Sequence, residues 1–197
     1  MLQLTQAVEI ISEQEAVPRS ALLTRITNQQ IAEVLFNIAT LLEMQQGNPY
    51  RIAAYRNAAR GLMALQEPAA NIIRRGARLE LPGLGERLRR KITELVTTGR
   101  MTFYNDLCEE LLPEDVRNLM AVPHVGPRTA LRLKGQLDIH SIAELYKAAS
   151  AHKIRECAGF GPRSEQRLEE GARVVLQAQQ TTPAQSAQAD QSGPQAA

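Results

Sequence analysis

The sequence of 197 residues contains no tryptophan and only three phenylalanines, so aromatic side chains make up just 4% of it. Sheets are built largely from β-branched and aromatic residues, whereas the alanine, leucine, arginine and glutamate that are frequent here favour helices. No stretch shows the alternation of apolar and polar residues that is typical of a strand. Apolar residues account for 44% of the chain, which is enough to form a core. The sequence therefore predicts an all-α protein.

Cysteine and long apolar runs are also scarce. Cys108 and Cys157 lie far apart and have no neighbouring metal-ligand pattern, which predicts two reduced thiols that are buried or half-buried. No apolar run approaches the roughly 18 residues that a membrane-spanning helix requires. The N-terminus, MLQLTQAVEIISEQE, lacks the basic start of a signal peptide. These absences predict a cytoplasmic protein with no membrane partner.

The net charge is small over the whole chain but uneven along it. The formal charge is +2, yet residues 51–100 hold eleven lysines or arginines against four glutamates, a local charge of +7. Such a patch is typical of a surface that binds a polyanion, and a solvated helix face is the alternative interpretation.

Residues 81–100, LPGLGERLRRKITELVTTGR, begin with a glycine hairpin that leads directly into a basic amphipathic helix. Glycine lets the backbone turn tightly and come close to a ligand, and a helix start offers N–H groups and the positive end of its dipole. This combination suits a phosphate, so the segment predicts a contact with the DNA backbone.

The hairpin occurs three times. In register with Gly83-Leu84-Gly85 lie His124-Val125-Gly126 and Gly159-Phe160-Gly161, which are 41 and 35 residues further on in turn. Each copy has an arginine two residues after its last glycine and a second cation four residues later, on the same helix face. The repetition predicts three related contacts with a sugar-phosphate strand. The paired cations are Arg87 and Lys91, Arg128 and Arg132, and Arg163 and Arg167.

Prolines, glycines and capping residues mark helix boundaries and divide the chain into four parts. Asn48 and Pro49 are predicted to start one helix, Gly99 to end the helix after the first hairpin, and Ser141 to cap a later helix. Residues 1–27 form an N-terminal extension, in which 1–17 have the pattern of a short amphipathic helix that either contacts a partner or is loosely attached. Residues 28–100 form a small four-helix domain that starts with Asn28 as N-cap and contains the first hairpin. Residues 101–177 form a second helical domain with the other two hairpins, and residues 178–197 form a disordered, low-complexity tail.

Four segments resemble the N-terminal region of family X DNA polymerases, and the bacterial form of that family most closely. The segments are GNPYRIAAYRNAAR, LPGLGERLRRKITELVTTGR, VPHVGPRTALRL and the Gly159-Phe160-Gly161 segment with its following Glu165. The resemblance covers about residues 28–175. It implies an eight-kilodalton helical domain followed by a helical fingers subdomain, each with helix-hairpin-helix motifs that hold the sugar-phosphate backbone around a gap or end.

Hairpins and resemblance together predict a set of DNA-binding residues on the helices and turns of both domains. The set consists of Gly83, Gly85, Arg87, Arg90, Lys91, His124, Gly126, Arg128, Arg132, Gly159, Gly161, Arg163, Arg167, Arg51 and Arg56.

The chain departs from the family pattern in two places. The family's palm domain, whose aspartates hold two magnesium ions for nucleotide transfer, has no counterpart here. The resemblance therefore implies a protein that does not polymerise, and a remnant of a larger polymerase is a further interpretation. In addition, His124 stands where the family has glycine, and it either hydrogen-bonds a phosphate or simply tolerates the turn.

The resemblance also implies a monovalent cation, sodium or potassium, bound by backbone carbonyl oxygens of the hairpins, with no cofactor otherwise required. Carbonyl ligands leave no side-chain signature in a sequence. By position, the carbonyls belong to Leu79, Leu81 and Leu84 in the first hairpin and to Met120, Val122 and Val125 in the second.

The resemblance implies one enzymatic alternative, a 5′-deoxyribose-phosphate lyase in which a lysine forms a Schiff base with an abasic sugar. Lys91 occupies the position of that lysine, and Tyr55 matches a pocket tyrosine or is a core residue. Four arginines of the same segment and an apolar flank would lower the pKa of Lys91, whereas Glu94 would raise it. Arginine fills this position in the other hairpins, and Phe103 stands where a lysine is usual. Lys91 is thus either catalytic or a phosphate contact.

The favoured hypothesis is a DNA-binding repair protein that recognises gaps, nicks or ends through phosphates and is associated with the nucleoid when bound. No helix rich in asparagine, glutamine and arginine is present to read base edges, and no aromatic platform is present for unstacked RNA bases. The alternatives are the lyase and a scaffold whose hairpins pair with a repair-protein partner.

Overall fold

The structure, a computed structural model, describes residues 26–181. Within this range it contains nine α-helices and one 3-10 helix and no strand, so the predicted all-α class is confirmed. The chain divides into two compact units, Met1–Leu107 and Cys108–Ala197. The helix predicted for residues 1–17 lies outside the described residues, as does the part of the predicted tail that follows residue 181. Residues 178–181, predicted to begin that disordered tail, are helical.

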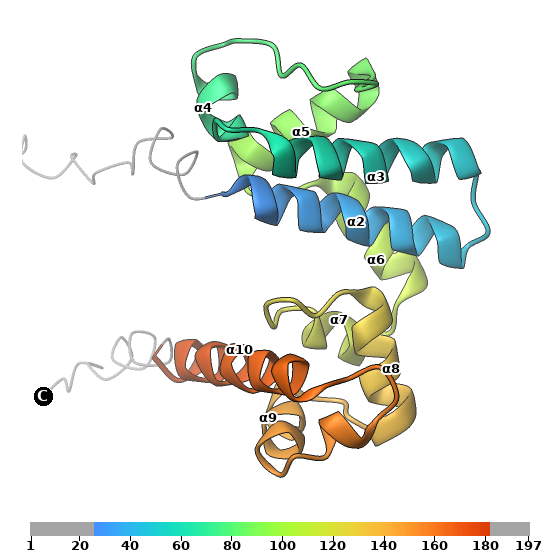
Figure 1. The fold of residues 1–197 in the computed structure, drawn as a ribbon, viewed down its shortest axis with the longest axis vertical. Helices are drawn as coiled ribbons and strands as arrows, with labels where there is room; N and C mark the ends of the chain where they lie inside the picture. The colour runs from blue at the N-terminus through green and yellow to red at the C-terminus, as the bar shows by residue number, and fades with distance from the viewer. Residues whose placement is uncertain (1–25, 182–197) are drawn as a thin grey trace, which may run out of the picture. The chain divides into compact units, whose positions relative to one another are not determined.

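The first unit is built on two antiparallel helices, α2 (Asn28–Met44) and α3 (Pro49–Ala64), which lie side by side (Figure 1). α2 begins with a capping box, in which the Thr27 hydroxyl accepts a hydrogen bond from Gln30 N–H and the Gln30 side chain accepts one from Thr27 N–H. Thr27 is therefore the N-cap, and the prediction of Asn28 at that position is wrong by one residue.

Asn28 instead supports the start of α4 (Ala69–Arg74). Its side-chain oxygen accepts a hydrogen bond from Ala69 N–H at 2.7 Å, and its Nδ2 donates to Glu67 O at 3.0 Å. The first of these bonds satisfies an N–H group that a helix start leaves without an intrahelical partner. A residue that the sequence suggests as a cap for one helix thus caps another, 41 residues away.

α5 (Glu86–Thr98) completes the four-helix arrangement of the first unit. It ends at Gly99, whose φ of +72° is favoured by glycine, as the sequence predicts. Leu88, Ile92, Leu95 and Val96 form the buried stripe of α5. The side chains that fill the centre of this unit are Ile31, Leu35, Ile38, Leu41, Leu62, Leu79 and Ile92, each at most 1% exposed.

α6 (Thr102–Leu111) spans the division between the units, and the second unit then contains four more α-helices. These are α7 (Glu114–Leu119), α8 (Pro127–Leu137), α9 (Ile142–Ser150) and α10 (Pro162–Thr181), with the 3-10 helix η1 (Ile154–Glu156) before the last. α9 packs against α10 (Figure 1). It starts at the predicted cap, Ser141, whose hydroxyl accepts a hydrogen bond from Glu144 N–H.

Both cysteines are free thiols, one buried and one half-buried, as predicted. None of the helices between residues 26 and 181 is both long enough and apolar enough to cross a membrane.

Candidate nucleic-acid interface

The three hairpins have the same backbone conformation. In each, an N–H donates to the carbonyl three residues earlier, at 3.0 Å in the first hairpin and 3.1 Å in the other two. The third residue of each turn has a positive φ, as a type II turn requires. The turns are Leu81–Leu84, Val122–Val125 and Cys157–Phe160, and the positive-φ residues are Gly83 at 73°, His124 at 67° and Gly159 at 80°. The repeat seen in the sequence is therefore a repeat in three dimensions.

Of the three positive-φ residues in these turns, only His124 has a Cβ atom. A left-handed conformation costs such a residue roughly 1–2 kcal/mol. The structure shows that the histidine adopts the conformation that glycine adopts in the other hairpins. Its predicted contact with a phosphate stays a prediction.

The second glycine of each hairpin leads directly into a helix. Gly85 and Gly126 are the N-caps of α5 and α8, and α10 begins immediately after Gly161. The arginine two residues later is exposed in every case and lies in the first turn of its helix. These exposed arginines are Arg87, Arg128 and Arg163.

Arg89, which the sequence analysis did not single out as a site residue, ties the first turn to α5. Its Nε donates to Leu79 O and its Nη2 to Leu84 O, both at 3.0 Å, and its side chain is only 13% exposed. The guanidinium also forms an ion pair with Glu86. Two of the three carbonyls predicted to hold a monovalent cation thus accept hydrogen bonds from a guanidinium, and a cation at this hairpin stays a prediction.

The second hairpin differs at this position, because Ala130 stands where the first has Arg89. Alanine offers no donor to the carbonyls of Met120, Val122 and Val125, and Val122 O accepts the turn bond from Val125 N–H. A monovalent cation at this hairpin stays a prediction.

Lys91, Tyr55 and Phe103 meet in the first unit. Lys91 Nζ donates to the Tyr55 hydroxyl at 3.3 Å and lies 3.0 Å from the centroid of the Phe103 ring. The Tyr55 and Phe103 rings are stacked, with 6.2 Å between their centroids. The Cζ atom of Arg51 lies 4.9 Å from the centroid of the Phe103 ring. Tyr55 is 5% exposed, so it is a core residue as well as a neighbour of the lysine.

This environment lowers the pKa of Lys91 to about 8. Burial is the largest cause, the positive charge of Arg51 adds to it, and Glu94 acts in the opposite direction. The charge effect thus comes from α3, and the expectation that arginines of the α5 segment supply it is wrong. Glu94 accepts hydrogen bonds from the N–H and hydroxyl of Thr102 at 2.9 and 2.6 Å, which keep its own pKa below the usual value.

The other predicted DNA-binding arginines of the first unit differ in whether they form ion pairs. Arg56 forms an ion pair with Glu43 at 2.9 Å. Arg87 and Arg90 are exposed and form no ion pair with another residue of the described part of the chain. Phe103 was noted in the sequence only as a departure from a family lysine, and no signal in the sequence indicated that its ring would lie against Lys91.

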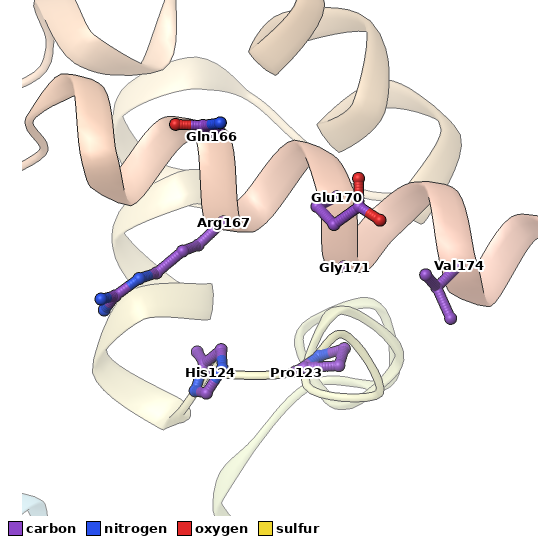
Figure 2. A pocket seen from close by; sticks show the side chains of 7 residues that line it. All are labelled: Pro123, His124, Gln166, Arg167, Glu170, Gly171 and Val174. Atoms are coloured by element: carbon purple, nitrogen blue, oxygen red, sulfur yellow. The ribbon is translucent and has the colours of Figure 1, made fainter.

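In the second unit, the turn of the second hairpin lies directly against α10. Figure 2 shows Pro123 and His124 on the turn and Arg167 and Val174 extending from α10 toward it. A Cβ atom on Gly171 would lie 2.9 Å from Val122 Cγ1, so only glycine allows this approach. A hollow of about 360 Å³ remains between turn and helix.

Two family descriptions cover most of the described residues. Residues 26–101 match "Helix-hairpin-helix domain", and residues 116–173 match "SAM-like Helix-hairpin-helix tandem". Over 140 residues the chain is 27% identical to the DNA polymerase/3′-5′ exonuclease PolX of Bacillus subtilis (strain 168). That match covers 71% of this chain and 24% of the relative, so the chain spans about a quarter of the relative's length. These similarities support DNA binding at a general level.

Proposed function

We propose that this chain, which is similar to the helix-hairpin-helix region of the family X DNA polymerases, holds the sugar-phosphate backbone of DNA at gaps, nicks or ends without reading base sequence. One observation carries the proposal: three hairpins share a turn conformation, and each starts a helix with an exposed arginine in its first turn. Helix starts and arginines are the groups that bind phosphates. A role in DNA repair, and a cytoplasmic location on the nucleoid, belong to the same proposal.

The charges of the first unit support this function. Arg87 and Arg90 follow the first turn on α5 and are exposed. Since phosphate contacts position a protein on DNA without specifying bases, binding through them gives a steep salt dependence and little sequence preference.

The first prediction concerns Arg87. Arg87→Ala is expected to weaken DNA binding about tenfold, because it removes one charge-assisted phosphate contact. The dependence of log K on log salt should become shallower by about 0.9 for the lost contact. Fluorescence anisotropy at several salt concentrations, with gapped and intact duplexes of the same sequence, measures both quantities.

Arg60→Ala is the matched control. Arg60 is also an exposed arginine of the first unit, but it lies in α3 and its guanidinium donates to Asn57 at 3.0 Å. Its loss removes the same charge and should leave the affinity nearly unchanged. Equal effects of the two variants would argue against a contact at the hairpin and favour the scaffold hypothesis. Equal wild-type affinity for gapped and intact duplexes would remove the structure-selective part of the proposal.

A second candidate function, 5′-deoxyribose-phosphate lyase, is favoured by the surroundings of Lys91. With a pKa of about 8, roughly a tenth of the lysine is neutral at pH 7, compared with about 0.03% at its ordinary value of 10.5. Neutral Nζ is the nucleophile that adds to the C1′ aldehyde of an abasic sugar, and loss of water then gives a Schiff base. β-Elimination from this imine removes a proton from C2′ and breaks the C3′–O bond, so the phosphate at C3′ leaves with its oxygen.

Borohydride trapping on an incised abasic duplex tests this candidate. The wild type is expected to form a covalent adduct whose yield rises with pH through about 8, where Lys91 loses its proton. Lys91→Arg keeps the charge and the phosphate contact but forms no imine, so it should bind DNA and give no adduct. Absence of an adduct with the wild type, or its persistence in Lys91→Arg, would reject the lyase function.

A further inference from the structure

The second and third hairpins border a half-open cavity of about 210 Å³ within the second unit. Its walls come from both turns and from the helices that follow them, α8 and α10. The polar side chains of the lining are those of His124, Thr129, Arg132, Ser164 and Arg167.

These residues form equivalent pairs in the repeat. Thr129 and Ser164 are each the third residue after the last glycine of their hairpin, and Arg132 and Arg167 are each the sixth. The first hairpin has an apolar Leu88 at the third position and therefore offers no hydroxyl there. The two hairpins of the second unit thus contribute the same two donors, a hydroxyl and a guanidinium, to one cavity.

The chemistry of the lining suits an anion. No carboxylate lines the cavity, and neither Arg132 nor Arg167 forms an ion pair with any residue in the described range 26–181. Two guanidinium groups carry a charge of +2 and present their donors in planar forks that match phosphate oxygens. Hydroxyl groups add donors of adjustable direction.

Arg132 is held in place by its neighbours. Its guanidinium lies 4.5 Å from the centroid of the Phe160 ring, which also lines the cavity. It approaches the turn so closely that a Cβ on Gly159 would lie 2.6 Å from Arg132 Nη2. A guanidinium stacked on an aromatic ring is preorganised, so less conformational entropy is lost when an anion binds.

We propose that this cavity binds a single phosphate group between Arg132 and Arg167, with Thr129 and Ser164 as hydroxyl donors. The proposal rests on the function proposed above, because it takes the phosphate group to be part of a DNA strand. The charge of +2 matches a phosphate monoester at a strand end, whereas a phosphodiester within a strand carries one negative charge. The second unit would thereby distinguish a phosphorylated DNA end from an unbroken strand.

Binding of duplexes with a one-nucleotide gap tests the proposal, with either a phosphate or a hydroxyl at the 5′ side of the gap. The wild type is expected to bind the phosphorylated gap about tenfold more tightly, and Arg167→Ala should abolish this difference. Arg173→Ala, which removes an exposed α10 arginine bonded to Glu170, is the matched control and should keep it. A loss in Arg167→Ala that is equal for both duplexes would assign the cavity to a phosphate within a strand and would overturn the proposed recognition of a phosphorylated end.

Because Arg132 packs on Phe160, Arg132→Ala risks a folding defect. Thr129→Val and Ser164→Ala remove the two hydroxyl groups and leave side chains of similar shape to the originals. These should weaken binding of the phosphorylated gap several-fold while the amide spectrum stays that of a folded unit. Titration with inorganic phosphate should shift the amide resonances of Gly159 and Ser164 in the wild type and not in Arg167→Ala.

The outcomes separate this proposal from the general one. If the wild type binds DNA but inorganic phosphate shifts none of these resonances and Arg167→Ala behaves like Arg173→Ala, the phosphate cavity is rejected while DNA binding stands. If inorganic phosphate binds at these residues but no DNA is bound, the cavity is supported and the proposed function fails.

Discussion

Gly171→Val is expected to lower the free energy of unfolding of the second unit by about 3 kcal/mol, the upper range for overpacking a closely packed interior. Val122, which a Cβ on Gly171 would meet at 2.9 Å, is itself 1% exposed and cannot move into solvent. Pro123 Cδ at 3.3 Å closes the other side of the same space. The larger side chain must therefore separate the turn of the second hairpin from α10.

Urea denaturation followed through amide resonances of α8 and α10 measures this effect in the full chain. Gly135→Ala is the matched control, since Gly135 lies within α8 and a Cβ there meets no atom within 4 Å. It should raise stability by about 0.5–1 kcal/mol, because alanine loses less backbone entropy in a helix than glycine. Wild-type stability in Gly171→Val would contradict the close packing of this turn on α10.

Glu165→Ala is expected to destabilise the second unit by about 2–3 kcal/mol, because the carboxylate is 1% exposed and satisfies several donors at once. It accepts hydrogen bonds from Arg155 N–H at 3.1 Å and from Arg155 Nε–H, and His152 Nδ1 lies 3.2 Å away. Removing it leaves the Arg155 backbone N–H without its partner. Glu165→Gln, which keeps the shape and one acceptor oxygen, should cost less.

The same carboxylate should make the second unit sensitive to acid. Burial raises the pKa of Glu165, but the hydrogen bonds and charge of Arg155 lower it by more, so that it lies below its ordinary value of 4.5. A group whose pKa is lower in the folded state stabilises that state above the unfolded pKa, and this stabilisation is lost as the pH falls through the folded value. Stability should therefore decrease below about pH 4.5.

Glu165→Gln isolates this contribution. Asp115 and Glu144 of the same unit also have lowered pKa values, so the wild type and the variant will both lose stability in acid. The difference between their unfolding free energies should shrink as the pH falls below 4.5, because only the wild type loses the Glu165 carboxylate. A difference that does not change with pH would show that the charge of Glu165 has no net stabilising effect.

Much of the fold could be predicted because its signals are local. Asn48 and Pro49 start α3, Ser141 caps α9 and Gly99 ends α5, as the sequence indicates. Each of these residues acts on backbone groups within a few positions of itself. The start of α2 was misplaced because Thr27 and Asn28 are both good caps, and the Asn28 side chain is used by Ala69 instead. A contact between segments that are distant in the chain decided between two local preferences.

The candidate site likewise combines features set by the local sequence with contacts between distant segments of the chain. The sequence by itself determined the three turns, since a left-handed residue followed by a helix start is a property of four or five consecutive residues. Only the tertiary structure decided what each cationic side chain contacts. Arg89 binds carbonyls at the first turn, Lys91 lies over the Phe103 ring, and Arg132 and Arg167 line one cavity. The physical reason is that long side chains have many rotamers of similar energy, and packing between elements far apart in the chain selects one of them.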